Sequence, residues 1–366
     1  MSRAHNFSAG PAVLPEEILS ELAEALPNFQ NTGLGLMELS HRSSTFDAVI
    51  ESAKNRFRNL MNIPADYEIL FLQGGASLQF YMTALNFLLP SDTADYINTG
   101  TWSTNALKEA RRIAPVKEIW KPESGIFNCV PSQEEIHMND DAVYLHYTSN
   151  NTIYGTQFHY KPETKKPLIA DLSSDICSRA IDVSKHQVIY AGAQKNLGPS
   201  GVTAVILSPW AVERSREVNK ARPEGLPSML NYGLMVNKNS MFNTPNTFGI
   251  FALERVLAWV ERQGGLDVIA KQNEKKSALL YAELDSSDFW KPHARKDSRS
   301  QMNVTWRLSN SELESIFIKK AEKANLMGLK GHRSVGGIRA SIYNACPLKS
   351  VEELISFMKD FRASHG

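Results

Sequence analysis

Short apolar runs bounded by turn residues recur between residues 68 and 207, and each predicts a β-strand. Helical patterns lie between several of them, for instance at 78–88 and 103–113. Alternating strands and helices are typical of an α/β domain with a mainly parallel sheet. The predicted strands are 68–72, 93–98, 116–120, 142–147, 167–172, 188–191 and 202–207.

The pattern changes after a predicted helix at 248–260. Arg262-Gln263-Gly264-Gly265 is typical of a helix end, and longer helices with two isolated strands, 301–308 and 337–343, follow it. We therefore predict a boundary near Gly265. Residues 16–265 are assigned to the large domain, and residues 1–15 with 266–366 to a smaller α+β domain.

Composition narrows the class of protein. The chain has 366 residues, 42% hydrophobic and 22% charged, which is ordinary globular usage and excludes disordered and collagen-like chains. Lys and Arg number 40 and Asp and Glu 39, so the formal charge is +1. Such a balance gives no net field to collect nucleic acid or an anionic membrane, and any bound anion must be held by local groups.

The cysteines and the apolar stretches bear on location. Cys129, Cys177 and Cys346 are too few and too scattered for a disulfide framework or a CxxC-type zinc site, and no metal site is expected. No apolar stretch reaches the ~20 residues of a membrane span, and residues 1–15 lack a signal-peptide core. We expect a cytoplasmic protein.

Polar or glycine-rich segments follow five of the predicted strands. They are residues 73–77, 99–102 and 149–152, the strand-end residue Asp171, and residues 192–195. Ligands of an open parallel sheet bind outside the carboxyl ends of its strands. The five segments are therefore expected to converge on one crevice.

The segment Gly74-Gly75-Ala76-Ser77 opens a predicted helix. Small residues there let backbone N–H groups approach an anion at the positive end of the helix, which makes it a candidate phosphate site. A simple glycine turn is the alternative. The pattern is neither GxGxxG nor GxxxxGK[ST], which argues against a dinucleotide site and a P-loop.

Lys195, Asp171 and Trp102 are the other candidates at these strand ends. Lys195 lies among small residues and turn formers, so no helix solvates it on an exposed face, and a lysine facing a crevice loses its proton more easily and can act as a nucleophile. Asp171 could pair with a protonated pyridine nitrogen. The alternatives are a surface lysine, a turn aspartate and a tryptophan that only packs a loop.

Seven segments resemble the class V, fold type I, pyridoxal-phosphate-dependent aminotransferases, and together they span essentially the whole chain. The resemblance implies a large domain around a mainly parallel sheet with a smaller α+β domain, pyridoxal 5'-phosphate as cofactor, and a homodimer with shared active sites. The segments are 6–11, 41–43, 71–77, 191–196, 241–245, 331–333 and 336–344.

The same resemblance implies the roles of the cofactor residues. Lys195 would hold the cofactor covalently and move a proton between the substrate Cα and the cofactor C4′, and Asp171 would keep the pyridine nitrogen protonated. Trp102 would stack on the ring, and Thr152 would bind its 3′ oxygen. The phosphate would be held by Ala76, Ser77 and Gln194, with Asn243 and Thr244 arriving from the other subunit.

Substrate residues follow in the same way. Arg339 would bind the α-carboxylate, and a distal phosphate would be surrounded by His332, Arg333, and the pair His41 and Arg42 of the other subunit. Arginine offers a planar fork that suits both anions. Some family members carry an arginine in the glycine loop, whereas this chain has Gln73 to Leu78 without one, so no extra phosphate contact is expected there.

The implied activity is exchange of an amino group between O-phospho-L-serine and 2-oxoglutarate. In the biosynthetic direction 3-phosphohydroxypyruvate and L-glutamate react, which serves serine biosynthesis. Alternatives are a transaminase acting on serine or alanine with glyoxylate, a sulfur-transferring relative that uses Cys346, and a non-enzymatic phosphometabolite-binding protein. A visible absorbance band that borohydride removes would distinguish the enzymes from the binding protein.

Overall fold

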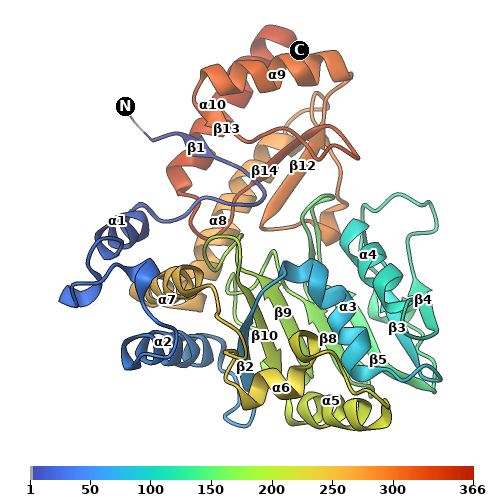
Figure 1. Cartoon of the computed structure of the whole chain (residues 1–366). Coiled ribbons are helices and arrows are strands. Elements are labelled where there is room, and N and C mark those ends of the chain that lie inside the picture. Colours follow the sequence, from blue (N-terminus) through green and yellow to red (C-terminus); the bar gives the residue numbers. More distant parts are fainter. Residues whose placement is uncertain (1–2) are drawn as a thin grey trace.

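A computed structural model describes residues 3–366, and its centre is a seven-stranded sheet (Figure 1). Strand β10 is antiparallel to both of its neighbours, while the other strands run in one direction. The strand order is β2 (Glu68–Leu72), β10 (Thr203–Leu207), β9 (Val188–Gly192), β8 (Leu168–Asp171), β5 (Ala142–Thr148), β3 (Thr93–Ile97) and β4 (Val116–Trp120). The seven strands predicted for this sheet are confirmed, with ends that shift by at most one residue.

Helices cover both faces of this sheet. Successive strand residues point to opposite faces and most are apolar, so both faces are buried. One buried cluster joins the sheet to α1 (Glu16–Ala25), α2 (Ser44–Met61) and α7 (Thr247–Arg262). The second cluster, on the opposite face, joins it to α3 (Gly75–Phe87), α4 (Thr101–Ala110), α5 (Pro209–Ala221) and α6 (Tyr232–Asn237). The α/β class with a mainly parallel sheet is confirmed.

The elements in the upper part of Figure 1 enclose a third cluster of buried hydrophobic residues. The two strands predicted as isolated, β12 (Asn303–Arg307) and β14 (Ile338–Ser341), pair with each other in an antiparallel sheet completed by β11 (Lys291–Pro292). Helices α8 (Leu266–Asp285), α9 (Ser311–Lys323) and α10 (Leu348–His365) pack around this small sheet.

Helix α8 packs in both parts of the molecule, namely the part around the seven-stranded sheet and the part around the third cluster. Leu266 and Ile269 belong to the cluster of α7, whereas Leu280 and Leu284 belong to the third cluster. The boundary near Gly265 stays a prediction. Within residues 3–366 no helix combines the length and apolar character that crossing a lipid bilayer requires.

Five two-residue strands were not predicted, namely β11 and the four that form the following two pairs. Strand β1 (His5–Asn6) pairs with β13 (Leu326–Met327), which ties the beginning of the chain to the third cluster. Strands β6 (Asn150–Asn151) and β7 (Thr156–Gln157) form a hairpin directly after β5. Both pairs are too short to give a periodic pattern in the sequence.

Candidate active site

A cavity of about 340 Å³ lies at the carboxyl ends of the parallel strands. All five predicted strand-end segments lie at this edge, because β2, β3, β5, β8 and β9 run in the same direction. Nine of the predicted site residues line the cavity, namely Ala76, Ser77, Trp102, Thr152, Asp171, Gln194, Lys195, His332 and Arg339.

Lys195 follows β9 and extends into this cavity. Its Nζ donates a hydrogen bond of 2.5 Å to Thr152 Oγ1. Burial, helped by the Arg339 charge and opposed by Asp171, lowers the pKa of the Lys195 ammonium to about 8. The neutral amine is therefore accessible near physiological pH, as a nucleophilic lysine requires.

Asp171 ends β8 on the cavity wall with 4% of its surface exposed. One carboxylate oxygen accepts the backbone N–H of Ser173 at 2.9 Å. Burial raises the pKa of Asp171, although the bond from Ser173 and the Lys195 charge oppose the shift. A cation placed in the cavity beside Asp171 would stabilise the carboxylate form.

The amino-terminal turn of α3 forms another wall. Gly74 precedes the helix at φ 88°, and a Cβ there would lie 2.5 Å from Leu78 Cδ2, so the turn requires glycine. Gly75, Ala76 and Ser77 line the cavity and present the unbonded N–H groups of a 13-residue helix. The glycine pattern predicted this turn as an anion site, and its place on the cavity wall is compatible with that role, which stays a prediction.

Arg339 comes from β14 on the opposite side. Its Nη1 donates to the backbone oxygen of Thr152 at 3.2 Å, whereas the buried Nε has no partner among residues 3–366. Burial lowers the pKa of Arg339. A half-buried guanidinium with a buried, free Nε donor favours a carboxylate or phosphate in the cavity.

His332 and Trp102 complete the walls. His332 Nδ1 lies 2.7 Å from Ser334 Oγ, and burial, followed by the Arg339 and Arg333 charges, lowers the pKa of the imidazole. Trp102 is held in the first turn of α4, and its buried Nε1 has no hydrogen-bond partner within the described chain.

Five predicted site residues do not line the cavity of a single chain. They are His41, Arg42, Asn243, Thr244 and Arg333. Arg42, Thr244 and Arg333 are exposed, and His41 and Asn243 are half-buried. In the glycine loop, exposed Gln73 donates through Nε2 to Thr244 O at 3.2 Å, which brings the loop next to the 243–244 segment.

The sequence did not predict that the amino-terminal segment reaches the cavity. Ala9 and Gly10 line it, and a Cβ on Gly10 would lie 3.6 Å from Gln194 Cγ and 3.7 Å from Lys195 Cγ. The Ala12 N–H donates to Gln194 O at 2.9 Å. The only signal was the segment 6–11 of the family resemblance. The other wall residues without a predicted role are Phe80, Thr148, Asn150, Ile153, Ser173 and Ser174.

Cys346 lies outside this cavity. It is 2% exposed, its thiol is free, and burial raises its pKa to about 11. A nucleophilic cysteine needs an accessible thiolate, so these surroundings disfavour the sulfur-transfer alternative.

Comparison with known proteins places this geometry in a family. The class V aminotransferase family model matches residues 4–354. A phosphoserine aminotransferase from Geobacillus kaustophilus is 50% identical over 363 residues, covering 99% of each chain. The solved phosphoserine aminotransferase from Bacillus circulans subsp. alkalophilus is 46% identical with a TM-score of 0.94, covering 100% of this chain and 99% of that one.

A third relative is described as a phosphoserine aminotransferase with PLP bound, from Trichomonas vaginalis. It is 35% identical with a TM-score of 0.92, covering 98% of this chain and 100% of its own. Identity of this level over whole chains confirms the resemblance inferred from the seven segments. The chain therefore belongs to the class V aminotransferase family, in its phosphoserine aminotransferase branch.

Proposed function

We propose that this chain is a pyridoxal-phosphate enzyme that exchanges an amino group between O-phospho-L-serine and 2-oxoglutarate, in the service of serine biosynthesis. The observation that carries the proposal is the meeting of three features in one cavity: the Lys195 amine, the buried Asp171 carboxylate and the free Nε donor of Arg339. They correspond to a nucleophile, a partner for a pyridinium nitrogen and an anchor for a carboxylate.

The residues around the cavity fit pyridoxal phosphate. The α3 amino terminus suits its phosphate, and the carboxylate of Asp171 suits its ring nitrogen. Trp102 supplies an aromatic face, and its unpartnered Nε1 is a further donor. When bound, the cofactor supplies an electrophilic carbon and a ring that withdraws electrons from the substrate Cα.

Within this proposal Lys195 binds the cofactor and then acts as general base and acid at the substrate Cα. Its pKa of about 8 permits both protonation states near neutral pH. Thr152 orients the amine, because its Oγ1 accepts the hydrogen bond from Nζ. Asp171 provides the negative charge that keeps a nearby ring nitrogen protonated.

Arg339 is the proposed anchor for the α-carboxylate of both substrates. Its Nη1 is held by Thr152 O, which leaves Nε to bind an anion in the cavity. The bond to Thr152 fixes the guanidinium on the same residue that orients Lys195. This places a bound α-carboxylate, and hence the Cα, at a defined position relative to the amine.

The distal phosphate site and the homodimer are part of the same proposal. His41, Arg42, Asn243 and Thr244 stay outside the cavity of one chain, so we infer that a second copy brings them to it. Exposed apolar side chains lie near both pairs in the sequence and support an interface here: Leu34 at 49%, Met37 at 69% and Phe242 at 41%. Arg333, exposed beside His332, would complete the phosphate site.

We also infer a cytoplasmic location, which the three free, buried thiols support. The partners are small molecules, namely phosphoserine, glutamate and the two keto acids.

The test of function is turnover by the purified protein. We expect phosphoserine with 2-oxoglutarate to be used at a kcat/KM at least about 10²-fold above serine or alanine, because distal charge pairing is lost with those substrates. A preference for alanine or serine with glyoxylate would contradict the proposal. A cofactor band in the visible that borohydride removes should accompany activity.

A further inference from the structure

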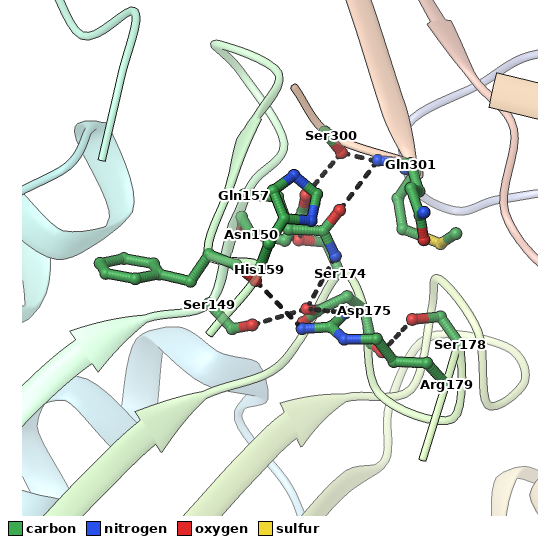
Figure 2. Close-up of polar contacts among 12 residues, drawn as sticks. Ser149, Asn150, Gln157, His159, Ser174, Asp175, Ser178, Arg179, Ser300 and Gln301 are labelled. Atoms are coloured by element: carbon green, nitrogen blue, oxygen red, sulfur yellow. Dashed lines mark hydrogen bonds and ion pairs between the residues drawn. The ribbon is translucent and has the colours of Figure 1, made fainter. Parts of the chain in front are cut away.

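In the hairpin after β5, the proposed function assigns a role to Thr152 but none to Asn150, although Asn150 is buried on the cavity wall. Figure 2 shows Asn150 between Ser174, in the turn after β8, and Ser300 of the segment before β12. Its Nδ2 donates to Ser174 Oγ at 2.8 Å and to Asn303 Oδ1 at 2.8 Å, while its Oδ1 accepts from Ser300 Oγ at 2.5 Å. Both ends of this amide are therefore used to join the two parts of the molecule.

The contacts of the hairpin recur at every second residue. Asn150 bonds Asn303, Arg339 Nη1 bonds Thr152 O at 3.2 Å, and Thr305 Oγ1 donates to Tyr154 O at 2.8 Å. Residues 152 and 154 lie in the turn between β6 and β7, so the hairpin stays in contact with the β12–β14 sheet from Asn150 into its turn.

The pairing of β12 with β14 links the hydrogen bond between Asn150 and Asn303 to the strand that holds Arg339. Asn303 lies opposite Ser341, and its Nδ2 donates to Ser341 Oγ at 2.9 Å. Ser341 and Arg339 are two residues apart on β14, so they lie on the same face. A shift of Asn303 relative to Asn150 would therefore move Arg339 relative to Thr152.

A second bridge lies beside the first. Gln157 accepts the Gln301 N–H at 2.9 Å and donates to Asp175 Oδ2 at 3.2 Å. Figure 2 shows that Asp175 also contacts Ser149 and Arg179. This bridge and the Tyr154 contact remain when Asn150 is removed, so a variant at 150 should keep the overall arrangement of the two parts.

We propose that Asn150 is a positioning residue that sets Arg339 in register with the cavity and thereby tunes affinity for the substrate α-carboxylate. The inference rests on the proposed function, because it assigns Arg339 to that carboxylate. Asn150 acts through Asn303, Ser341 and β14. Its loss should weaken carboxylate binding and leave the binding of pyridoxal phosphate intact.

The experiment measures binding of glutarate, an unreactive dicarboxylate, to the pyridoxal-phosphate-loaded protein by calorimetry. We expect Asn150→Ala to raise the glutarate Kd about ten-fold and the KM for glutamate by a similar factor, with kcat changed less than about three-fold. The affinity of the apoprotein for pyridoxal phosphate should change less than about two-fold. Ser341→Ala, a smaller change at the far end of the bridge, should raise the glutarate Kd about three-fold.

Asn273→Ala is the matched control. Asn273 is equally buried and also joins the two parts, donating to Ser178 O and Asn344 Oδ1, but it has no bond to the hairpin. We expect it to lower the melting temperature and leave the glutarate Kd unchanged. In an Arg339→Lys background, Asn150→Ala should add less than about a two-fold loss, because both changes act on one contact.

Three results would overturn the inference. They are an unchanged glutarate Kd in both Asn150→Ala and Ser341→Ala, an equal loss in Asn273→Ala, or a full additional loss in the Arg339→Lys background. Failure of glutarate to bind the unsubstituted protein would instead overturn the role of Arg339, and with it the proposed function on which the inference rests.

Discussion

The cofactor half of the site and its distal half differ in how completely one chain builds them. We define the cofactor half as Lys195, Asp171, Thr152 and the α3 amino terminus, and the distal half as His41, Arg42, His332 and Arg333. Every member of the cofactor half lines the cavity, whereas His332 is the only member of the distal half among residues 3–366 that does.

The two halves also differ in how deeply their charged groups are buried. The cavity lowers the pKa of Lys195 to about 8 and raises that of Asp171, so the surroundings of these groups already adjust their protonation. Arg42 and Arg333 are exposed in the single chain, where water screens their charge. The cofactor half is therefore preorganised by the fold, and the distal half needs the second subunit that we propose.

The largest effect is expected in the cofactor half, from Lys195→Ala. No other amine lines the cavity within residues 3–366, so nothing replaces Lys195 as the group that moves the proton at Cα. We expect kcat to fall by at least about 10⁴-fold, measured as amino transfer from phosphoserine. Noncovalent binding of pyridoxal phosphate should survive. Turnover at the level of the unsubstituted protein would remove Lys195 from the mechanism.

Asp171→Asn should have the next largest effect. An amide can still bond a ring nitrogen, but it cannot stabilise a positive charge there, so we expect each half-reaction to slow by about 10²- to 10³-fold. The decrease is measured in single-turnover experiments that follow the cofactor absorbance, with unchanged far-ultraviolet circular dichroism as the control for folding. Equal rates for both proteins would contradict the assigned role.

The cofactor half was also the more predictable half from sequence. The strands before residues 73, 99, 149 and 192 are buried in a sheet, which makes them mainly apolar runs. The polar segments after them could therefore be assigned to one edge of the sheet without a structure. The distal half rests on resemblance, since a His-Arg pair in a loop has no periodicity that distinguishes a ligand site from a solvated surface.

Contacts between segments far apart in the chain could not be predicted from the sequence. Asn150 and Asn303 are 153 residues apart, and nothing local to either predicts their bond. The approach of Gly10 to Lys195 is of the same kind. Local patterns predict secondary structure and strand ends, whereas such pairings depend on how the completed elements pack.

Arginine substitutions compare the halves directly. Arg339→Ala should lower kcat/KM for phosphoserine and glutamate by similar factors of about 10², because both lose the partner of an α-carboxylate, at a cost of about 3 kcal/mol. Arg42→Ala should lower it about ten-fold for phosphoserine and less for glutamate, since the phosphate carries more charge than a carboxylate. Half-reactions followed by absorbance decide this. The reversed pattern would mean that the two anion sites are exchanged.

Mixed dimers test whether Arg42 crosses the interface. Lys195→Ala and Arg42→Ala chains, each of low activity alone, should regain about a quarter of the unsubstituted activity after subunit exchange, because half of the dimers are mixed and each mixed dimer has one intact site. Activity is measured after exchange is verified by mass spectrometry of differently tagged chains. No recovery would place Arg42 within the site of its own chain.

The smallest effect concerns pH and the cofactor half alone. In the proposed function Lys195 reacts as the neutral amine, and its pKa of about 8 means that this form increases as the pH rises. The neutral fraction grows about five-fold between pH 7 and pH 8, so the initial rate of covalent pyridoxal phosphate uptake by the apoprotein should grow by the same factor and level off above pH 9. Stopped-flow absorbance measures that rate. Asp171 raises the pKa of Lys195, so Asp171→Asn should move the rise to lower pH, whereas Arg42→Ala, in the exposed distal half, should leave it in place. A rate that does not change between pH 7 and pH 8 would show that the pKa of Lys195 in the cavity is not near 8.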